Sequence, residues 1–175
     1  GIILPIGSTE QHGPTGFVGT DALTAEAIGQ RLGEKVGAYV TPTISVGMAQ
    51  HHLGFSGSIT LKPSTLIAVV RDIIDSLAVH GFERFFFING HGGNIATVTA
   101  AFSEVYANAS LGKGSNQKSV KCMLQNWFMM PGVIALAKKL YGNAEGSHAT
   151  ASEIAVTYAL FPDTAEKLKN ITLEP

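Results

Sequence analysis

Four large apolar residues, Phe85–Ile88, stand between charged residues and the polar segment Asn89–Asn94. Successive residues of a strand point to opposite faces, so a run that is apolar at every position predicts a strand buried on both faces. Such strands are typical of the centre of a parallel sheet with helices above and below it. The run Ile2–Ile6 has the same character and also ends abruptly, in the segment Gly7–Pro14. The two runs together predict an α/β fold.

Segments with helical spacing of apolar residues separate the expected strands. Leu66, Val70 and Ile74, for example, recur on one helical face. Alternation of strands and helices predicts βαβ units with right-handed crossovers and a mainly parallel sheet. Further strands are expected at Tyr39–Ile44 and Val120–Trp127, and helices at Ala22–Val36, Thr65–His80, Ile95–Asn108, Pro131–Tyr141 and Ala149–Leu160.

Length and composition favour one domain over residues 1–175. The chain is 45% hydrophobic and only 14% charged, which is compatible with a homo-oligomer that buries extensive surface. A formal net charge of −1 without a basic cluster argues against nucleic acid as a partner, and the apolar runs are too short to cross a membrane. The single cysteine, Cys122, rules out an internal disulfide and fits the reducing cytoplasm. Because the sequence starts inside an expected strand without a methionine, we expect further residues before Gly1.

The loop after the first strand carries two carboxylates and an imidazole, at Glu10, His12 and Asp21. Open α/β sheets bind ligands at the carboxyl ends of their strands, and these three side chains form a ligand set for a divalent metal. The glycines and Pro14 allow the loop to fold back, so that the three groups can converge. Two alternatives stay open: a hydrogen-bonded polar cluster for Glu10 and His12, and a helix N-cap for Asp21.

A histidine, His91, follows the second buried strand within the segment Asn89–Asn94. The glycines around it leave space for close approach of a ligand or a metal. The alternatives are a glycine-rich phosphate loop and a plain strand-to-helix turn. The segment has no lysine and matches neither the P-loop pattern nor G-x-G-x-x-G. A metal-binding histidine is therefore the better interpretation.

A third polar group consists of His148 and Glu153, near the start of the last expected helix. A cap and a surface carboxylate would explain them without any function. The residues around them are small or apolar, however, which indicates that this helix end is buried, and a buried glutamate needs a cation or hydrogen-bond donors. In the loop Val46–Ser58, the pair His51 and His52 is explained equally well as part of a pocket or as exposed residues.

Taken together, four motifs resemble the creatininase (creatinine amidohydrolase) family. They are P-I-G-S-T-E-Q-H-G-P at Pro5–Pro14 with G-T-D at Gly19–Asp21, G-F-S-G-S-I-T-L at Gly54–Leu61, N-G-H-G-G-N at Asn89–Asn94, and S-H-A with a later glutamate at Ser147–Glu153. They occur in the family's order and at plausible spacing. The resemblance implies a three-layer α/β/α sandwich, two divalent metal ions (Zn, Mn or Fe) and a hexamer as the homo-oligomer.

The resemblance also implies metal ligands in three of these motifs, namely Glu10, His12, Asp21, His91 and Glu153. Glu10, Asp21 and His91 would hold one metal, while His12 and Asp21 would hold the other, with Asp21 bridging. In creatininase a glutamate two positions after the loop histidine completes the second site, but this chain has Gly93 there. Other family members share N-G-H-G-G-N and can use the later glutamate, which points to Glu153. The departure at Gly93 argues against creatinine as the substrate.

The mechanism implied is hydrolysis of an amide or lactam bond of a small molecule. A hydroxide bridging the metals would attack the carbonyl, and His148, grouped with Glu153 as catalytic, would shuttle a proton to the leaving nitrogen. Candidates for the pocket wall are Phe17, Met48, His51, His52 and Trp127. The alternatives are a deformylase or peptide-trimming hydrolase of the same family and a non-catalytic metal-binding module. A proton donor such as His148 favours an enzyme, because a purely structural site has no use for one.

Overall fold

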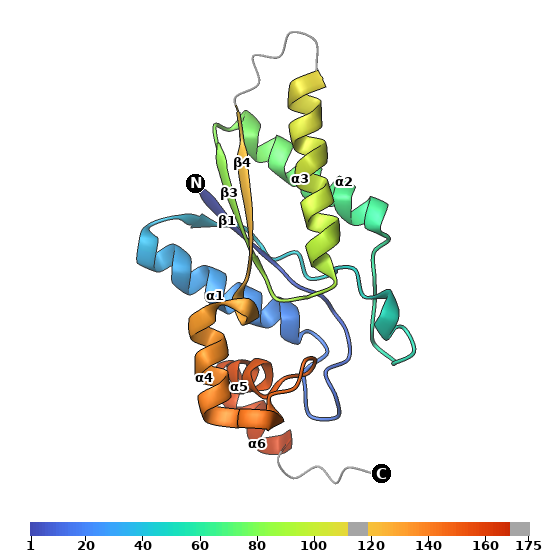
Figure 1. Ribbon diagram of the computed structural model, residues 1–175, viewed down its shortest axis with the longest axis vertical. Coiled ribbons are helices and arrows are strands. Elements are labelled where there is room, and N and C mark those ends of the chain that lie inside the picture. The colour runs from blue at the N-terminus through green and yellow to red at the C-terminus, as the bar shows by residue number, and fades with distance from the viewer. Residues whose placement is uncertain (112–118, 169–175) are drawn as a thin grey trace.

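A parallel sheet forms the middle of the molecule (Figure 1). The computed structural model describes residues 1–111 and 119–168, and within them the sheet has four strands in the order β2-β1-β3-β4, all parallel. The strands are β1 (Ile2–Ile6), β2 (Tyr39–Val40), β3 (Arg84–Asn89) and β4 (Lys121–Asn126). The predicted parallel α/β fold is confirmed, and the two all-apolar runs are the central strands.

Helices cover both faces of the sheet and produce the expected three-layer α/β/α sandwich. They are α1 (Thr20–Val36), α2 (Pro63–Val79), α3 (Asn94–Leu111), α4 (Pro131–Tyr141), α5 (Ala151–Leu160) and α6 (Pro162–Leu168), with short 3-10 turns η1 (Gln50–His52), η2 (Trp127–Met129) and η3 (Gly142–Ala144). α2 and α3 pack together on one face and α1 lies on the other, while α4, α5 and α6 gather beyond the end of β4. Among the described helices, none is long and apolar enough to span a membrane.

The core explains why the central strands are apolar at every position. Leu4 and Phe87 point into the layer formed with α2 and α3, whereas Ile3 and Ile88 point into the layer formed with α1. All four side chains are buried. Full burial of one such side chain stabilises the fold by ~1.5–3 kcal/mol, so the alternating contacts hold both helical layers to the sheet.

The second strand is shorter than the predicted Tyr39–Ile44. Regular pairing with β1 ends after Val40. Pro42 has no backbone N–H to donate to a ladder, so the strand cannot continue through it. The chain nevertheless follows β1, because Ile44 forms an isolated bridge with Ile6 and donates its N–H to the carbonyl of Pro5 at 3.0 Å.

Four of the five predicted helices begin one or two residues away from the predicted start, and the differences at α1 and α5 concern polar residues of interest. α1 starts at Thr20 instead of Ala22, so Asp21 lies in its first turn, and the N-cap position belongs to Gly19. The N-cap alternative for Asp21 is therefore wrong. α5 starts at Ala151 instead of Ala149, since Ala149 has a φ of 50°, which is left-handed and ends any helical run there.

The loops that follow β1 and β3 lie side by side because their strands pair directly. Ile6 is in register with Asn89, and the N–H of Gly90 donates to the carbonyl of Ile6 at 2.9 Å. The start of α1 closes over both strand ends, so closely that a Cβ on Gly90 would lie 2.2 Å from the carbonyl oxygen of Asp21. Glycine at this position therefore brings the two polar loops into contact.

Candidate metal centre

The loop after β1 buries three potential ligands together. Glu10, His12 and Asp21 are 0%, 1% and 2% exposed. His12 donates its Nδ1–H to the carbonyl of Glu10 at 3.1 Å, and its Nε2 lies 3.0 Å from Asp21 Oδ1. Burial opposes charge on both partners, but their mutual hydrogen bond and attraction outweigh it, so the pKa of His12 is raised and that of Asp21 is lowered. Glu10 and His12 thus do belong to a hydrogen-bonded polar cluster, as the alternative interpretation proposed. The same cluster also has the ligand atoms that a cation could bind.

His91 joins this group from the loop after β3. Its Nδ1 lies 3.0 Å from Asp21 Oδ2 and 3.2 Å from Glu10 Oε1, while its Nε2 lies 2.9 Å from the carbonyl oxygen of Met48. Burial disfavours the charged ring, but the hydrogen bonds and charges of Asp21 and Glu10 dominate and raise the pKa of His91 to about 10. Without a metal, a proton therefore occupies the position between this ring and the carboxylates.

Gly93 is required by the orientation of the His91 ring. A Cβ at Gly93 would lie 2.4 Å from His91 Nε2 and 2.4 Å from the carbonyl oxygen of Met48. A glutamate there, as in creatininase, would need both groups to shift. The departure from the creatininase motif is therefore part of how this chain holds His91.

Two asparagines fix the same loop. Asn89 donates its side-chain amide to the carbonyl of His91 at 2.6 Å and accepts the His91 N–H at 3.1 Å. Asn94 donates to the carbonyl of Gly7 at 2.9 Å and accepts the N–H of Met48 at 3.0 Å. The loops that follow β1 and β3 are thereby tied into one rigid unit.

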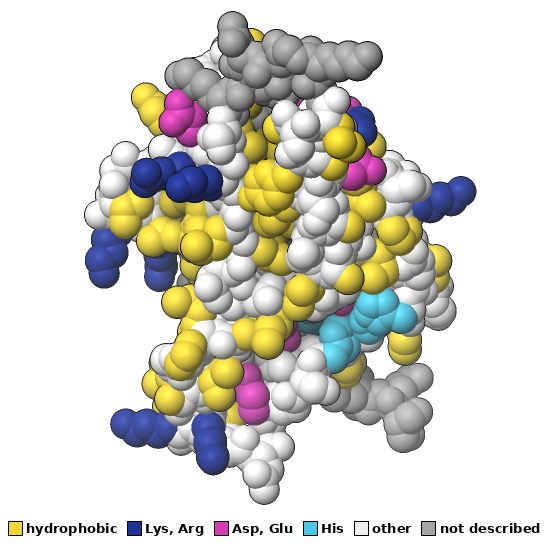
Figure 2. Space-filling view, turned by 45° about the horizontal axis from the view of Figure 1, so that its top comes forward, with side chains coloured by type: hydrophobic (Ala, Val, Ile, Leu, Met, Phe, Trp, Pro, Cys, Tyr) yellow, Lys and Arg dark blue, Asp and Glu magenta, His cyan; other side chains and the backbone are white. Residues whose placement is uncertain are grey.

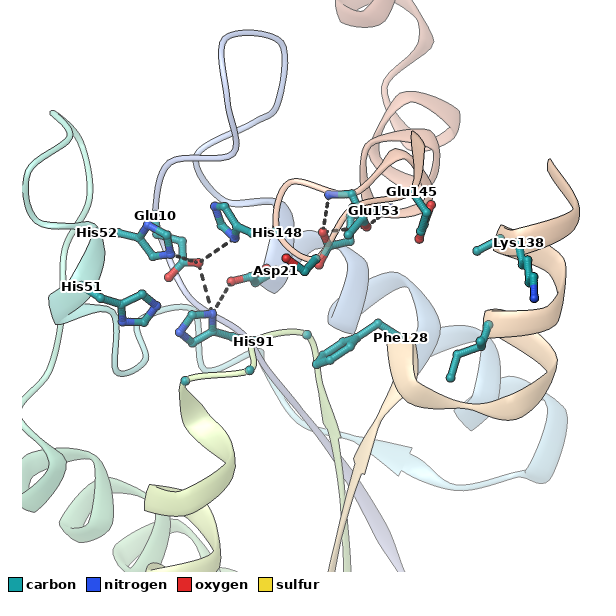
Figure 3. A pocket seen from close by; sticks show the side chains of 18 of the residues that line it. Glu10, Asp21, His51, His52, His91, Phe128, Lys138, Glu145, His148 and Glu153 are labelled. Carbon is teal, nitrogen blue, oxygen red and sulfur yellow. Dashed lines mark hydrogen bonds and ion pairs between the residues drawn. The ribbon is translucent and has the colours of Figure 1, made fainter. Parts of the chain in front are cut away.

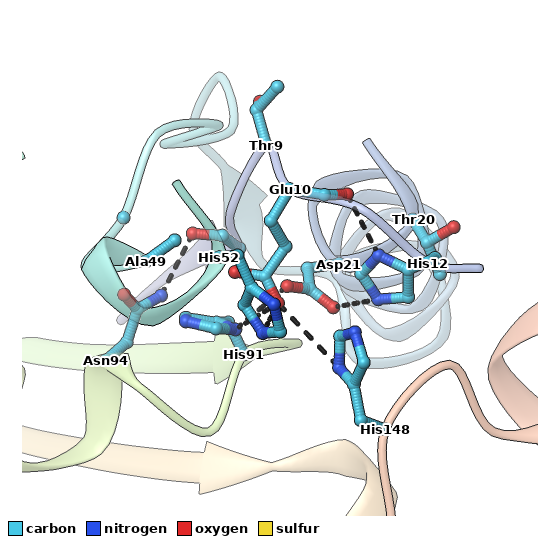
Figure 4. A network of polar contacts seen from close by, with 12 residues as sticks. Thr9, Glu10, His12, Thr20, Asp21, Ala49, His52, His91, Asn94 and His148 are labelled. Carbon is cyan, nitrogen blue, oxygen red and sulfur yellow. Dashed lines mark hydrogen bonds and ion pairs between the residues drawn. The ribbon is translucent and has the colours of Figure 1, made fainter. Parts of the chain in front are cut away.

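The buried carboxylates have the features of a metal site (Figure 4). Within the described residues, Glu10 Oε1, Glu10 Oε2 and Asp21 Oδ2 are buried without a hydrogen bond of good geometry. Histidine nitrogens lie 3.0–3.2 Å from carboxylate oxygens of Glu10 and Asp21. Two ligand atoms that bind one ion, each at ~2.0–2.2 Å from the ion, lie about as far from one another as these nitrogen and oxygen atoms do. These residues therefore fit a divalent cation.

His148 and Glu153 reach the site from the segment that begins α5 (Figure 3). His148 Nδ1 lies 3.9 Å from Glu10 Oε1, and the side chain is 36% exposed. Glu153 is buried and closes a capping box, because its Oε2 accepts the N–H and the hydroxyl of Thr150, each at 2.8 Å. Burial raises the pKa of Glu153 despite these hydrogen bonds. The N-cap is Thr150 and not His148, and Glu153 is buried, so the alternative of a cap with a surface carboxylate is wrong. The Glu153 side chain lines the cavity, as Asp21 does.

The pair His51 and His52 also belongs to the cavity wall. His52 Nε2 lies 3.4 Å from Glu10 Oε1, its side chain is only 13% exposed, and its ring stacks on His148 with centroids 4.4 Å apart. Burial lowers the pKa of His52, and the neighbouring histidines lower it further against the attraction of Glu10. The exposed-pair alternative is wrong for His52.

Gln11 is the functional candidate that the sequence prediction missed. Its side-chain amide nitrogen lies 3.1 Å from His52 Nδ1 and 2.9 Å from His148 Nε2, so that one side chain joins two rings from distant segments. Its position between two predicted ligands, Glu10 and His12, was the available signal.

A cavity of about 620 Å³ opens over these groups. Figure 2 shows the histidine side chains gathered beside a hollow on one face of the molecule. The opposite wall comes from the segment between β4 and α5, with Phe128, Ile134, Lys138 and Glu145. Trp127, a predicted wall residue, instead packs in the core under α1. The other two predicted wall residues, Phe17 and Met48, do not line the cavity either.

A family model named Creatininase, described as creatinine amidohydrolase, matches residues 1–172. The chain belongs to the creatininase family. This membership confirms the resemblance seen in the motifs. Among relatives, the creatinine amidohydrolase of Pseudomonas putida is 29% identical over 174 residues, which are 94% of this chain and 66% of that enzyme. The mycofactocin precursor peptide peptidase of Mycolicibacterium smegmatis is 34% identical over 106 residues, which are 57% of this chain and 42% of that protein.

Solved creatininase structures share the fold. The structure named "Creatininase Mn" superposes with a TM-score of 0.80 at 28% identity, covering 99% of this chain and 70% of its own. A mutant creatininase described as Zn-Zn type has a TM-score of 0.78 at 28% identity, covering 93% of this chain and 66% of its own. This creatininase-family chain thus has the sandwich of solved creatininases, one described with Mn and one with Zn, and carries a possible metal-binding cluster of its own.

Proposed function

We propose that this chain binds two divalent metal ions and hydrolyses an amide or lactam C–N bond of a small molecule. The observation that carries the proposal is the buried group Glu10, His12, Asp21 and His91, in which carboxylate oxygens without good hydrogen bonds face histidine nitrogens. A buried cluster of this kind is stable only with protons or a cation between its members. Kinship with a creatinine amidohydrolase supports the cation and the reaction class.

In the proposed centre Glu10, Asp21 and His91 would hold one ion, and His12, Asp21 and Glu153 would hold the other. Since the helix cap uses Oε2 of Glu153, Oε1 is the oxygen proposed as ligand. Divalent ions held there supply a Lewis acid and a water acidic enough to act as the nucleophile near neutral pH. The three carboxylates offset most of the charge of two such ions, which makes their joint burial tolerable.

His148 is proposed to carry a proton to the leaving nitrogen. Its Nδ1 faces Glu10 across 3.9 Å without a hydrogen bond, so this nitrogen is free to take up or give a proton in the cavity. Its Nε2 lies 2.9 Å from two groups of Gln11, the side-chain NH₂, which can donate to it in the neutral ring, and the backbone carbonyl, which accepts Nε2–H in the charged ring. A partner for the charged form is what a proton-transferring imidazole needs.

A second candidate, trimming of a peptide, is favoured by two observations. The peptide peptidase matches with higher identity than the creatinine amidohydrolase, although over a shorter stretch. The cavity of about 620 Å³ is also within the ~300–1,000 Å³ of sites for drug-sized ligands, so it has room for more than one small ring.

We also propose that the chain assembles into a homo-oligomer, a hexamer. The surface of α4 supports this proposal. Leu136 and Leu140, four positions apart on one side of this helix, are 56% and 59% exposed. Apolar side chains gathered on one helix are typical of a contact surface. Light scattering of the purified protein would measure the assembly, and a monomer at micromolar concentration would contradict it.

The decisive test is the metal content of protein purified without chelator, for the wild type and for Glu153→Gln. We expect about two metal ions per wild-type chain and about one in the variant, with Glu34→Gln, on the exposed side of α1, as a matched control that keeps both. A screen of lactams, formamides and short peptides on the loaded protein then separates the two candidate substrates. No metal in the wild type, even after addition of Zn or Mn, would overturn the proposal.

A further inference from the structure

The hydrogen-bond partners of the histidines around Glu10 divide them into two kinds. His12 and His91 each turn one ring nitrogen to a backbone carbonyl, at 3.1 Å from Glu10 and 2.9 Å from Met48 respectively. A carbonyl can only accept, so that nitrogen carries the proton and the inner nitrogen is left as the metal ligand. Metal-bound histidines are fixed in this way as a rule.

His52 has the opposite arrangement. Its outer nitrogen, Nδ1, lies 3.1 Å from the side-chain nitrogen of Gln11. The orientation of that amide is fixed, because the N–H of Gly13 donates to Gln11 Oε1 at 2.9 Å. An NH₂ group can only donate, so Nδ1 of His52 accepts, and the proton of the neutral ring is on Nε2. The Nε2–H therefore points toward Glu10 Oε1, 3.4 Å away, in the centre of the site.

This tautomer decides between two roles for His52. By distance alone, Glu10, His52 and His148 form a possible metal-binding group, since their ligand atoms all lie within 4.8 Å of one another. A protonated nitrogen has no lone pair for a metal, however. The hydrogen bond from Gln11 thus makes His52 a donor toward the centre.

We propose that His52 is a further catalytic residue, whose Nε2–H donates to the carbonyl oxygen of the bound amide as negative charge develops there. The inference rests on the proposed hydrolase function. His52 lines the cavity. Its ring is held between two others, because the ring centroids of His148 and His51 lie 4.4 Å and 4.2 Å from its own. Its proton stays on Nε2 throughout, because no transfer is required of a donor that stabilises an oxyanion. Gln11 is the positioning residue that sets the tautomer.

The tautomer can be read directly from the ¹⁵N chemical shifts of imidazole nitrogens in histidine-labelled protein loaded with Zn²⁺. We expect His52 to be protonated at Nε2 and bare at Nδ1, and His12 and His91 to be bound to metal. Gln11→Glu replaces the donor by an acceptor of the same shape and should move the His52 proton to Nδ1. Gln50→Glu, an exposed position in the same 3-10 turn, should leave it unchanged. A metal-bound or unprotonated His52 Nε2 in the wild type would overturn the inference.

The donor role is tested with methylphosphonate, a tetrahedral anion, as the probe. In Zn²⁺-loaded His52→Leu we expect its dissociation constant to rise at least about tenfold, as for loss of one hydrogen bond to a charged group, with metal content unchanged. His52→Gln, which keeps a donor, should lose less. Equal affinity in wild type and both variants, or loss of metal from them, would disprove the role. If the wild type binds no metal at all, the proposed function fails, while the ¹⁵N shifts still report the tautomer.

Discussion

The two walls of the cavity hold their functional side chains in different ways. On the sheet side, Glu10, His12, Asp21 and His91 are buried and connected through backbone carbonyls and two asparagines. On the α5 side, His148 is 36% exposed and lies in the loop between η3 and α5. Its neighbour Ala149 has a left-handed φ of 50°.

The difference matches what each wall is proposed to do. Ligands must keep one geometry, and groups held by packed strands and helices keep it best. A proton carrier must exchange with solvent and change its charge, which a partly exposed ring can do. Variants that affect one wall alone test this difference.

The largest effect is expected from Asp21→Asn on the sheet side. Asp21 contacts both His12 and His91, so its loss removes the shared carboxylate of both proposed sites. Metal affinity should fall by more than the ~10–100-fold typical of losing a group that only supports a ligand, and hydrolysis should fall with it. Metal analysis and turnover on the same samples check this, with Asp72→Asn, an exposed carboxylate, as control. Retention of two metals would show that Asp21 does not bridge.

His148→Ala should leave the sheet side intact and remove only the proton carrier. Turnover should fall about 10²–10⁴-fold, the range for general acid–base groups, with metal content at the wild-type level. His80→Ala, at the exposed end of α2, is the matched histidine control. Near-normal turnover with both metals bound would mean that another group moves the proton.

The same two walls differ in how far the sequence predicted them. Apolar runs that end in glycine-rich polar segments predicted the strands, and the pairing of Ile6 with Asn89 then brings Glu10 and His91 together. Periodicity and turn chemistry are local signals, and the sheet side is built from them. The assignment of these residues as ligands stays a prediction.

The α5 side was harder to predict because its contacts are not local. Gln11 contacts His148, which is 137 positions away in the sequence, and no sequence pattern predicts that contact. The start of α5 was misplaced because an alanine in a left-handed conformation has no sequence signal. Pro42 was an available signal for the early end of β2, but the predicted strand ran past it to Ile44.

A methyl group at Gly93 should disturb the sheet side although it replaces none of the proposed ligands. Its Cβ would lie 2.4 Å from the Met48 carbonyl and from His91 Nε2, so Gly93→Ala must displace the ring. Overpacking of this kind costs about 1–3 kcal/mol of unfolding free energy, and weaker metal binding should accompany it. At Gly92 a Cβ meets nothing within 4 Å, so Gly92→Ala should change neither quantity. Urea unfolding and metal titration of both variants compare them, and equal behaviour would contradict the steric account.

A pH dependence of stability is expected for the metal-free protein. The pKa of His91 is raised to about 10 in the folded state, so its ion pair stabilises the fold fully below its ordinary pKa of 6.5. That contribution should be lost as the pH rises from there through about 10. Urea unfolding of chelator-treated protein across this range should show falling stability, and His91→Gln should flatten the slope. Metal-loaded protein should not show the slope, because a cation then occupies the place of the proton. An unchanged slope in His91→Gln would locate the titrating group elsewhere.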